Sequence, residues 1–372
     1  MSGLYLHIPF CSKRCNYCNF YFSVNKKLIP DYISALKKEI NLTSEKYHSI
    51  EFDSVYFGGG TPSLLSESEL SSILDTLYSN FKISPYSEIS IESNPEDLDE
   101  SKIKSYINKG INRLSLGIQS LNDNELIFLS RKHNRIQSLE VINLVKKYFN
   151  NYSLDIIYSL PGQTFENIKD TLDIFIQTEV PHISAYTLTF EENTLLHKNL
   201  KDKLISKNST DIEADLFLKL SSYLNKTGYS HYEVSSFSKS GFESKHNSKY
   251  WTYTDYIGFG PSAHSFYKNK RWNNYSSLGK YIRLINENKS PIEKSISLNQ
   301  EESKFEFLTL SLRHKGINFD VYEKLFNEDF KIIYDDVIKI LKSNELAEVK
   351  SGFIKLTDKG YLLADEICSR YF

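Results

Sequence analysis

Residues Gly3–Cys18, GLYLHIPFCSKRCNYC, join a predicted strand over Gly3–Ile8 to a short loop with three cysteines, Cys11, Cys15 and Cys18. Three thiolates in one loop can bind three corners of an iron–sulfur cube, whereas an ordinary [4Fe–4S] cluster takes four cysteines. The remaining cysteine, Cys368, is distant in sequence, so one iron would keep an open coordination position. The spacing leaves one alternative open, a zinc site with His7 as the fourth ligand.

The first strand begins a series of six strand-then-helix units. Parallel strands need crossover connections, which helices provide, and right-handed crossovers curl a sheet in one direction. Six units are fewer than the eight of a closed barrel, so we predict an α/β fold, an open partial (β/α)6 TIM-like barrel. A flat doubly wound sheet is the alternative, disfavoured because no GxGxxG follows the first strand. The strands are predicted over residues 3–8, 53–57, 88–92, 113–117, 154–158 and 182–188. Helices are predicted over 31–47, 122–129, 137–149, 165–178 and 211–226; a further helix begins at residue 66, and another ends at residue 110.

The pattern changes after about residue 229. We predict three parts: a core domain over residues 1–230, an aromatic-rich connecting segment over 231–299 with few helical signals, and a C-terminal domain over 300–372. The last part is mainly helical and winged-helix-like. Its predicted helices cover 302–313, 320–326, 331–344 and the residues from 358 on, and its predicted hairpin covers 346–350 and 352–356.

Composition limits the function. Lys and Arg number 45 and Asp and Glu number 47, a net charge of −2, which argues against nucleic-acid binding despite the winged-helix-like end. Hydrophobic residues at 40% and charged residues at 25% are typical of a globular chain. We find no apolar run of 18 residues and no signal-peptide pattern, so we expect a cytoplasmic protein that is not a membrane protein. Clustered cysteines in a reducing compartment favour a metal site over disulfides, and Cys368 is expected to be a structural thiol.

Several motifs together resemble the radical S-adenosylmethionine superfamily. Within it, the sequence is similar to the branch that contains the oxygen-independent coproporphyrinogen III oxidases and the HemW-type haem chaperones. The motifs are His7-Ile8-Pro9-Phe10-Cys11-x3-Cys15-x-Tyr17-Cys18, Gly58-Gly59-Gly60-Thr61-Pro62-Ser63, Glu92-x-Asn94-Pro95, Ser115-Leu116-Gly117-Ile118-Gln119-Ser120, Arg131-x-His133, Asp155-Ile156-Ile157-Tyr158-x-Leu160-Pro161-Gly162-Gln163 and His246-Asn247-x2-Tyr250-Trp251.

The resemblance implies a [4Fe–4S] cluster on Cys11, Cys15 and Cys18, with S-adenosylmethionine at the fourth iron. Glycines let the backbone approach a ligand closely. Three polar residues are expected at or just past strand ends, where a barrel places its site, and an arginine pairs well with a carboxylate. The residues implied in cofactor binding are Tyr5, Gly59, Gly60, Thr61, Glu92, Gln119, Arg131 and Asp155.

Two departures separate the members of this branch. The oxidases carry a further cysteine where this chain has Phe20. They also carry a longer segment before the cluster, whereas in this chain only ten residues precede Cys11. Both favour the HemW type. The segment His246-Asn247-Ser248-Lys249-Tyr250-Trp251 matches a motif associated with haem in that type, which implies His246 as an axial ligand. A hydrogen-bonded core histidine is the alternative reading of His246, and His264 is a second candidate ligand.

The implied function is a haem chaperone without coproporphyrinogen oxidase activity, which binds haem beside the cluster and S-adenosylmethionine. It would deliver haem to haem-requiring client proteins, with membrane-associated respiratory enzymes among the candidates, and a homodimer is left open. The main alternative is an oxygen-independent coproporphyrinogen III oxidase, a radical enzyme. A winged-helix nucleic-acid binder is a distant third.

Overall fold

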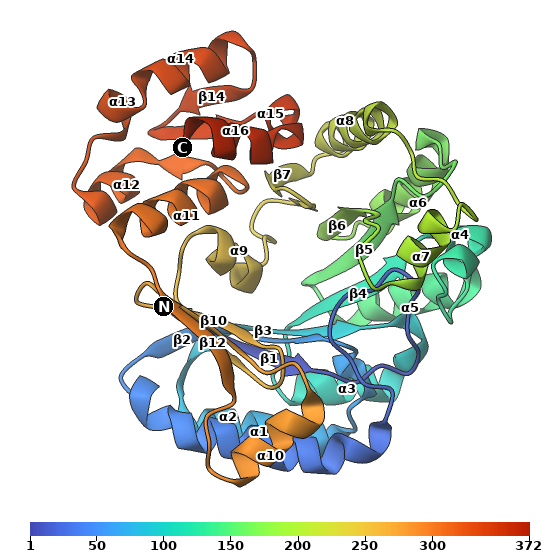
Figure 1. Ribbon diagram of the computed structural model, residues 1–372. Helices are drawn as coiled ribbons and strands as arrows, with labels where there is room; N and C mark the ends of the chain where they lie inside the picture. Colours follow the sequence, from blue (N-terminus) through green and yellow to red (C-terminus); the bar gives the residue numbers. More distant parts are fainter.

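Six parallel strands follow one another both along the chain and across the sheet. Each pairs in parallel with the next, and the first and sixth strands do not meet, so the sheet stays open. The computed structural model describes residues 1–372, and it confirms the predicted open barrel (Figure 1). The strands are β1 Ser2–Ile8, β2 Glu51–Gly59, β3 Lys82–Ser93, β4 Arg113–Gln119, β5 Tyr152–Tyr158 and β6 His182–Thr187.

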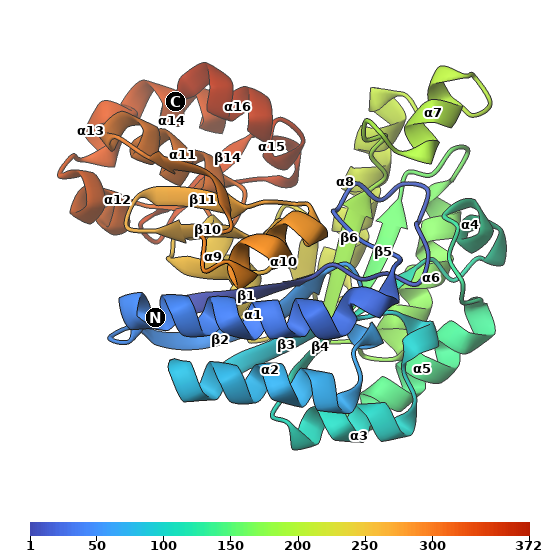
Figure 2. The same cartoon turned by 60° about the horizontal axis from the view of Figure 1, so that its bottom comes forward.

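Helices between these strands cover the outer, convex side of the sheet, as Figures 1 and 2 show. Several begin where the sequence supplies a capping box, as with Ser66 and Glu69 at the start of α2 and Thr164 and Asn167 at the start of α6. These caps satisfy backbone N–H groups that a helix start leaves free. The helices between the strands are α1 Ile29–Thr43, α2 Glu67–Asn80, α3 Glu100–Asn108, α4 Asp123–Phe128, α5 Arg135–Tyr148 and α6 Phe165–Gln177. Two more helices follow β6: α7 Leu195–Lys201 and α8 Thr210–Lys226.

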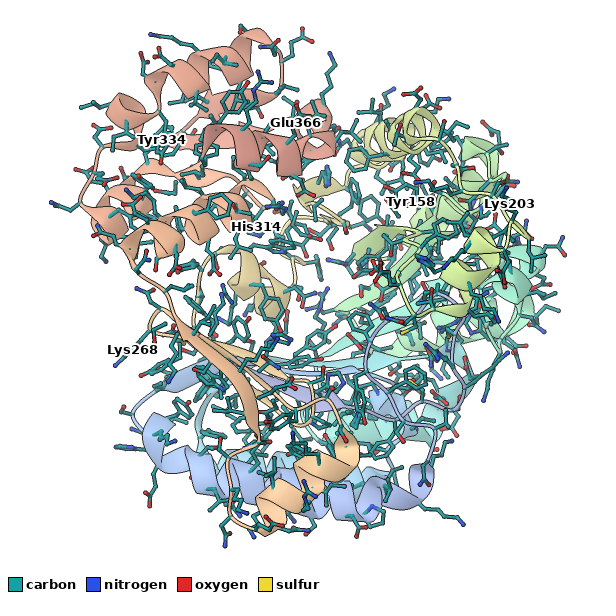
Figure 3. The ribbon with its side chains drawn as sticks, in the orientation of Figure 1. Tyr158, Lys203, Lys268, His314, Tyr334 and Glu366 are labelled. Atoms are coloured by element: carbon teal, nitrogen blue, oxygen red, sulfur yellow. The ribbon has the colours of Figure 1, made fainter.

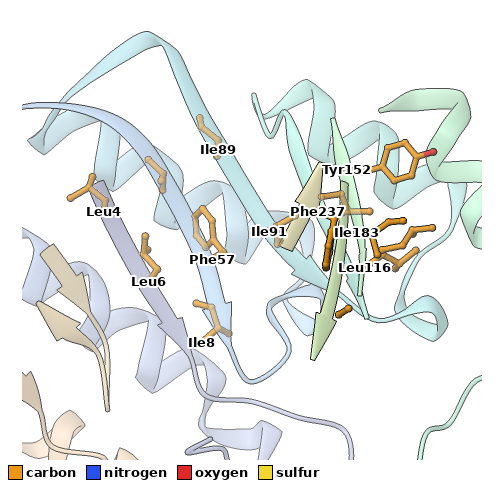
Figure 4. Close-up of a cluster of buried hydrophobic side chains, with 14 of the residues drawn as sticks. Leu4, Leu6, Ile8, Phe57, Ile89, Ile91, Leu116, Tyr152, Ile183 and Phe237 are labelled. Atoms are coloured by element: carbon orange, nitrogen blue, oxygen red, sulfur yellow. The ribbon is translucent and has the colours of Figure 1, made fainter. Parts of the chain in front are cut away.

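Side chains alternate between the two faces of the sheet. On β1, Leu4, Leu6 and Ile8 are fully buried in the main apolar core (Figure 4). This core also includes residues of α1 and α2. Each such side chain contributes about 1.5–3 kcal/mol through burial. The intervening residues, Tyr5 and His7, point to the concave side, so the same strand builds the core and the site.

Residues 231–299 add strands to both ends of the main sheet. The full order is β12-β11-β10-β9-β1-β2-β3-β4-β5-β6-β8-β7, with β9 parallel to β1. The sequence signal here was weak because most of these strands are only three to six residues long. The division of the chain into three parts stays a prediction. The elements are β7 Ser230–Glu233, β8 Ser236–Ser238, α9 Lys245–Trp251, β9 Tyr256–Phe259, β10 His264–Tyr267, β11 Lys270–Asn274, α10 Leu278–Asn286 and β12 Ile292–Ser297.

The C-terminal part packs helices around a small sheet of order β13-β15-β14, and its residues His314, Tyr334 and Glu366 are labelled in Figure 3. The helix predicted over residues 331–344 is two helices, because Tyr334 leaves helical geometry and packs its ring on Phe330 and Phe372. No helix is both long and apolar enough to span a membrane. The elements are α11 Gln300–Leu312, β13 Ile317–Asn318, α12 Phe319–Phe326, α13 Phe330–Ile333, α14 Asp335–Ser343, β14 Ala347–Lys350, β15 Phe353–Leu356, α15 Asp358–Leu362 and α16 Ala364–Tyr371.

Candidate functional site

A pocket of about 810 Å³ opens at the carboxyl ends of the parallel strands. It brings together most of the residues singled out in the sequence, although they come from loops and strands far apart in the chain. Tyr5 and His246 are not among the lining residues. The predicted site residues that line it are Cys11, Cys15, Cys18, Gly59, Gly60, Thr61, Glu92, Gln119, Arg131 and Asp155.

The cysteine loop follows β1 and reaches across the ends of β4 and β5 (Figure 2). Its base is closed by the N–H of Cys11, which donates to the carbonyl of Ser23, and its tip by Asn16, which donates to the carbonyl of Phe128 in α4. Burial raises the pKa of the Cys11 thiol to about 11. The metal-free thiol is therefore neutral at pH 7, and metal binding would displace its proton.

The donors are not arranged as a single zinc site. Thiolates around one tetrahedral zinc lie about 3.8 Å apart, and no three His, Cys, Asp or Glu side chains are placed to share one metal ion. The ring of His7 is already engaged: one nitrogen is 3.2 Å from the Tyr5 hydroxyl and the other 3.1 Å from the Tyr21 carbonyl oxygen. His7 is thus not poised as a fourth ligand.

The glycines after β2 bring that strand against the end of β1. A Cβ on Gly59, whose φ is +104°, would lie 2.6 Å from the His7 ring, and one on Gly60 would lie 2.8 Å from the carbonyl oxygens of Ile8 and Phe10. The close approach that requires glycine is therefore to the chain's own first strand. It places the hydroxyl of Thr61 3.4 Å from the Sγ of Cys11.

Arg131 lies between the cysteine loop and the strand ends. Its Nη1 is 3.3 Å from the Tyr17 hydroxyl, and its Nη2 donates to Oδ1 of Asn94 at 2.6 Å and to the carbonyl of Gly117 at 3.0 Å. Its Nε is buried and has no partner. A half-buried guanidinium with a free, buried Nε donor fits an anionic ligand group such as a carboxylate.

Two carboxylates face the pocket from the strands. Glu92 accepts from the Tyr56 hydroxyl at 2.8 Å and from the N–H of Gly59 at 3.2 Å. Burial raises its pKa to about 7, helped by the charge of Asp155 and opposed by the Tyr56 bond. Asp155 accepts from Ser115 at 2.7 Å through Oδ2, while its buried Oδ1 has no partner.

Backbone details refine the sequence expectations. Asp155 lies in the middle of β5, which continues to Tyr158, and it still reaches the pocket. Gln119 ends β4 with a φ of +68°, a strained conformation for a residue other than glycine. Such strain gathers at functional sites. The unpaired atoms of Arg131 and Asp155 match a ligand that carries a carboxylate and hydroxyl groups, and S-adenosylmethionine carries both.

Five residues that line the pocket were quoted in motifs but not predicted as site residues: Tyr17, Asn94, Ser115, Gly117 and Ile157. Asn94 and Tyr17 both hold Arg131, and Ser115 holds Asp155. Asn94 could have been found from its place directly after β3, because that is where a barrel presents its site residues. Tyr17 and Ser115 gave no signal beyond their motifs.

His246 lies in α9, fully buried on the concave side of the sheet. Glu88 accepts from its backbone N–H at 2.9 Å, and its two ring nitrogens lie 2.9 Å from the hydroxyls of Ser54 and Tyr250. Burial lowers its pKa to about 3, so the imidazole is neutral. His264, at the start of β10, is exposed.

Comparison with known proteins agrees with this geometry. Residues 5–175 match the Radical SAM superfamily, and residues 298–363 match the HemN C-terminal domain. The solved structure of coproporphyrinogen III oxidase (HemN) from Escherichia coli shares the fold, with a TM-score of 0.85 at 24% identity over 99% of this chain and 89% of that one.

Two relatives named "Heme chaperone HemW" align along nearly their whole length. The Lactococcus lactis protein is 33% identical over 100% of this chain and 97% of its own. The Bacillus subtilis protein is 31% identical over 99% of this chain and 98% of its own.

An open (β/α)6 barrel with three cysteines after its first strand defines a radical S-adenosylmethionine protein, a class that implies a [4Fe–4S] cluster and S-adenosylmethionine. Within that class, the chain belongs to the HemW family.

Proposed function

We propose that this chain is a haem chaperone, which binds haem beside a [4Fe–4S] cluster and S-adenosylmethionine and delivers the haem to client proteins. The observation that carries the proposal is the near-complete alignment with relatives that are named heme chaperones. Phe20 supports it, because the resemblance implies a further cysteine at that position in the oxidases.

For the cofactors, we propose Cys11, Cys15 and Cys18 as the cluster ligands. S-adenosylmethionine would take the open iron, with its carboxylate on Arg131 and its ribose hydroxyls on Glu92 and Asp155. Gly59, Gly60, Thr61 and Gln119 would complete this pocket, and Tyr5 would support it through His7. The bound pair supplies one-electron chemistry; the residues of this chain orient it and limit access of water.

For haem, we propose His246 as the axial ligand, with His264 as the second candidate. The neutral imidazole of His246 suits iron. Because both ring nitrogens are hydrogen-bonded in a buried position, haem binding requires α9 to move and one of these bonds to break. A carrier must also release its cargo, and a micromolar Kd, about 8 kcal/mol, is compatible with release.

The test is a haem titration followed by transfer. The reconstituted protein should bind haem and then pass it to an apo-haemoprotein such as apomyoglobin, measured by absorbance. His246→Ala should weaken haem binding at least tenfold, while His264→Ala should not. Absence of haem binding by the unmodified protein would contradict the chaperone proposal; formation of protoporphyrinogen IX from coproporphyrinogen III in an anaerobic assay would establish the oxidase instead.

A further inference from the structure

Three aromatic rings meet between the cofactor pocket and α9. The rings of Tyr56 and His246 are stacked, with centroids 5.1 Å apart and planes 23° apart. Tyr5 stacks against both, at 6.2 Å from Tyr56 and 6.4 Å from His246. In a densely packed interior, none of these rings can tilt without displacing the others. We call Tyr5, Tyr56 and His246 the ring cluster.

One end of the ring cluster reaches the pocket through Tyr56. This side chain is itself buried, and its hydroxyl donates to Oε1 of Glu92 at 2.8 Å. The other carboxylate oxygen of Glu92 accepts from the N–H of Gly59. A ligand hydroxyl that donates to Oε1 of Glu92 would share that oxygen with the Tyr56 hydroxyl and compete with it. A ligand in this position would therefore act on the Tyr56 ring.

A second connection runs from the cysteine loop. The carbonyl of Tyr21, in that loop, accepts from Nε2 of His7, which leaves Nδ1 to accept from the Tyr5 hydroxyl. This assignment of the His7 tautomer follows from the carbonyl, which can only accept. The loop that carries the cysteines is thus linked to the ring cluster through one histidine.

The far end of the ring cluster is the ring of His246. Its ring nitrogens are hydrogen-bonded to the hydroxyls of Ser54 and Tyr250, so the ring becomes available to another ligand only when it turns. It cannot turn freely while the Tyr56 ring lies 5.1 Å away, nearly parallel to it. Release of Tyr56 from Glu92 would remove that restraint.

We propose that Tyr56 is a positioning residue that couples occupancy of the S-adenosylmethionine pocket, at Glu92, to the availability of His246 for haem. The inference rests on the proposed function. When the ribose hydroxyls take over Glu92, Tyr56 loses its acceptor, the ring cluster loosens, and His246 is freed to bind iron. By linkage, S-adenosylmethionine and haem then strengthen each other's binding by the same factor.

The experiment measures haem affinity of the reconstituted, oxidised holoprotein with and without saturating S-adenosylmethionine. The wild type should bind haem at least fivefold more tightly with the cofactor present. A factor of about five is the lower end of the coupling factors typical of two linked binding sites. Tyr56→Phe keeps the ring but not the hydroxyl, so its two Kd values should agree within about twofold. Tyr229→Phe is the matched control, because this buried tyrosine donates to the carbonyl of Val180, apart from the pocket. It should keep the wild-type ratio.

A reciprocal titration keeps the test valid if the Tyr56→Phe variant does not take up its [4Fe–4S] cluster. The wild-type affinity for S-adenosylmethionine, from a calorimetric titration of the same oxidised holoprotein, should rise by the same factor when haem is bound. Unchanged or weaker haem binding with the cofactor, or a Tyr56→Phe ratio equal to the wild type, overturns the coupling. Absence of haem binding under every condition overturns the proposed function as well.

Discussion

The Nη1 of Arg131 lies 3.7 Å from the Sγ of Cys15, a residue 116 positions earlier in the chain. The same guanidinium donates to Asn94 and Gly117 from the other side. One partly buried cation therefore stands beside a proposed cluster ligand and at the proposed carboxylate site of S-adenosylmethionine. If both assignments hold, the two cofactors share a single pocket.

Arg131→Lys should weaken S-adenosylmethionine binding and spare the cluster. Lysine keeps the charge but cannot supply the planar set of donors. A hydrogen bond to a charged group is worth about 1.5–3 kcal/mol, so we expect a loss of about 10- to 150-fold in affinity. The EPR perturbation of the reduced cluster measures it. Arg135→Lys is the control, because Arg135 donates to the carbonyl of Leu121 and does not line the pocket. Equal effects in both variants would argue against the assignment.

Replacing any one of Cys11, Cys15 and Cys18 by Ala should abolish the cluster. A cube anchored at three corners has no spare thiolate, so bound iron and acid-labile sulfide should fall at least tenfold after anaerobic reconstitution. Cys368→Ala should retain both, because Cys368 is buried in the C-terminal part beside Arg313. Zinc in place of iron and sulfide in the oxygen-protected wild type would refute the cluster assignment.

Gly60→Ala should destabilise the site, since its Cβ would meet two backbone carbonyl oxygens at 2.8 Å. Backbone atoms cannot move aside as a side-chain end does, so we expect a loss of about 1–3 kcal/mol in the free energy of unfolding, with reduced cluster uptake. Gly279→Ala in α10 is the contrasting change: its Cβ would meet nothing within 4 Å. It should be neutral or stabilise the helix by up to about 1 kcal/mol. Urea unfolding of both variants measures the two changes in the free energy of unfolding.

The sequence predicted the six parallel strands well, because each is a run of apolar residues followed by a helix with a clear start, as at Ser66. The family resemblance indicated most of the residues that line the pocket, and the convergence of strand ends explains Glu92 and Gln119, whereas Tyr5 and His246 do not line it. The sequence did not reveal the short strands of residues 231–299. Strands such as β8, with three residues, are determined by pairing with the existing sheet and not by local preference.

The sequence left two readings of His246 open, a haem ligand and a hydrogen-bonded core histidine. His246 is a hydrogen-bonded core histidine in this conformation, although its motif implies a haem ligand. The motif carries no information on whether Tyr56 and Ser54, from β2, cover the ring. Such contacts between distant segments depend on the folded arrangement, which no local pattern reports.

A buried carboxyl should make stability depend on pH. Glu39 in α1 accepts from the N–H of Gly260, the amide of Asn274 and the hydroxyl of Tyr281. Burial outweighs these bonds and raises its pKa from 4.5 to about 7. Between these values the folded state binds more protons than the unfolded state, so this contribution is complete below about pH 4.5 and is lost as pH rises through 7.

Glu39→Gln removes this titration, and the comparison isolates it from all other groups. We expect the difference in the free energy of unfolding, wild type minus variant, to fall by about 2–3 kcal/mol from pH 5 to pH 8, since one pKa unit corresponds to about 1.4 kcal/mol. Urea unfolding followed by tryptophan fluorescence gives both values. Glu140→Gln, on the exposed side of α5, is the matched control for the substitution itself. A Glu39→Gln difference that stays constant, or grows, as pH rises would show that Glu39 is already ionised in the folded protein at pH 5, with its three donors outweighing its burial.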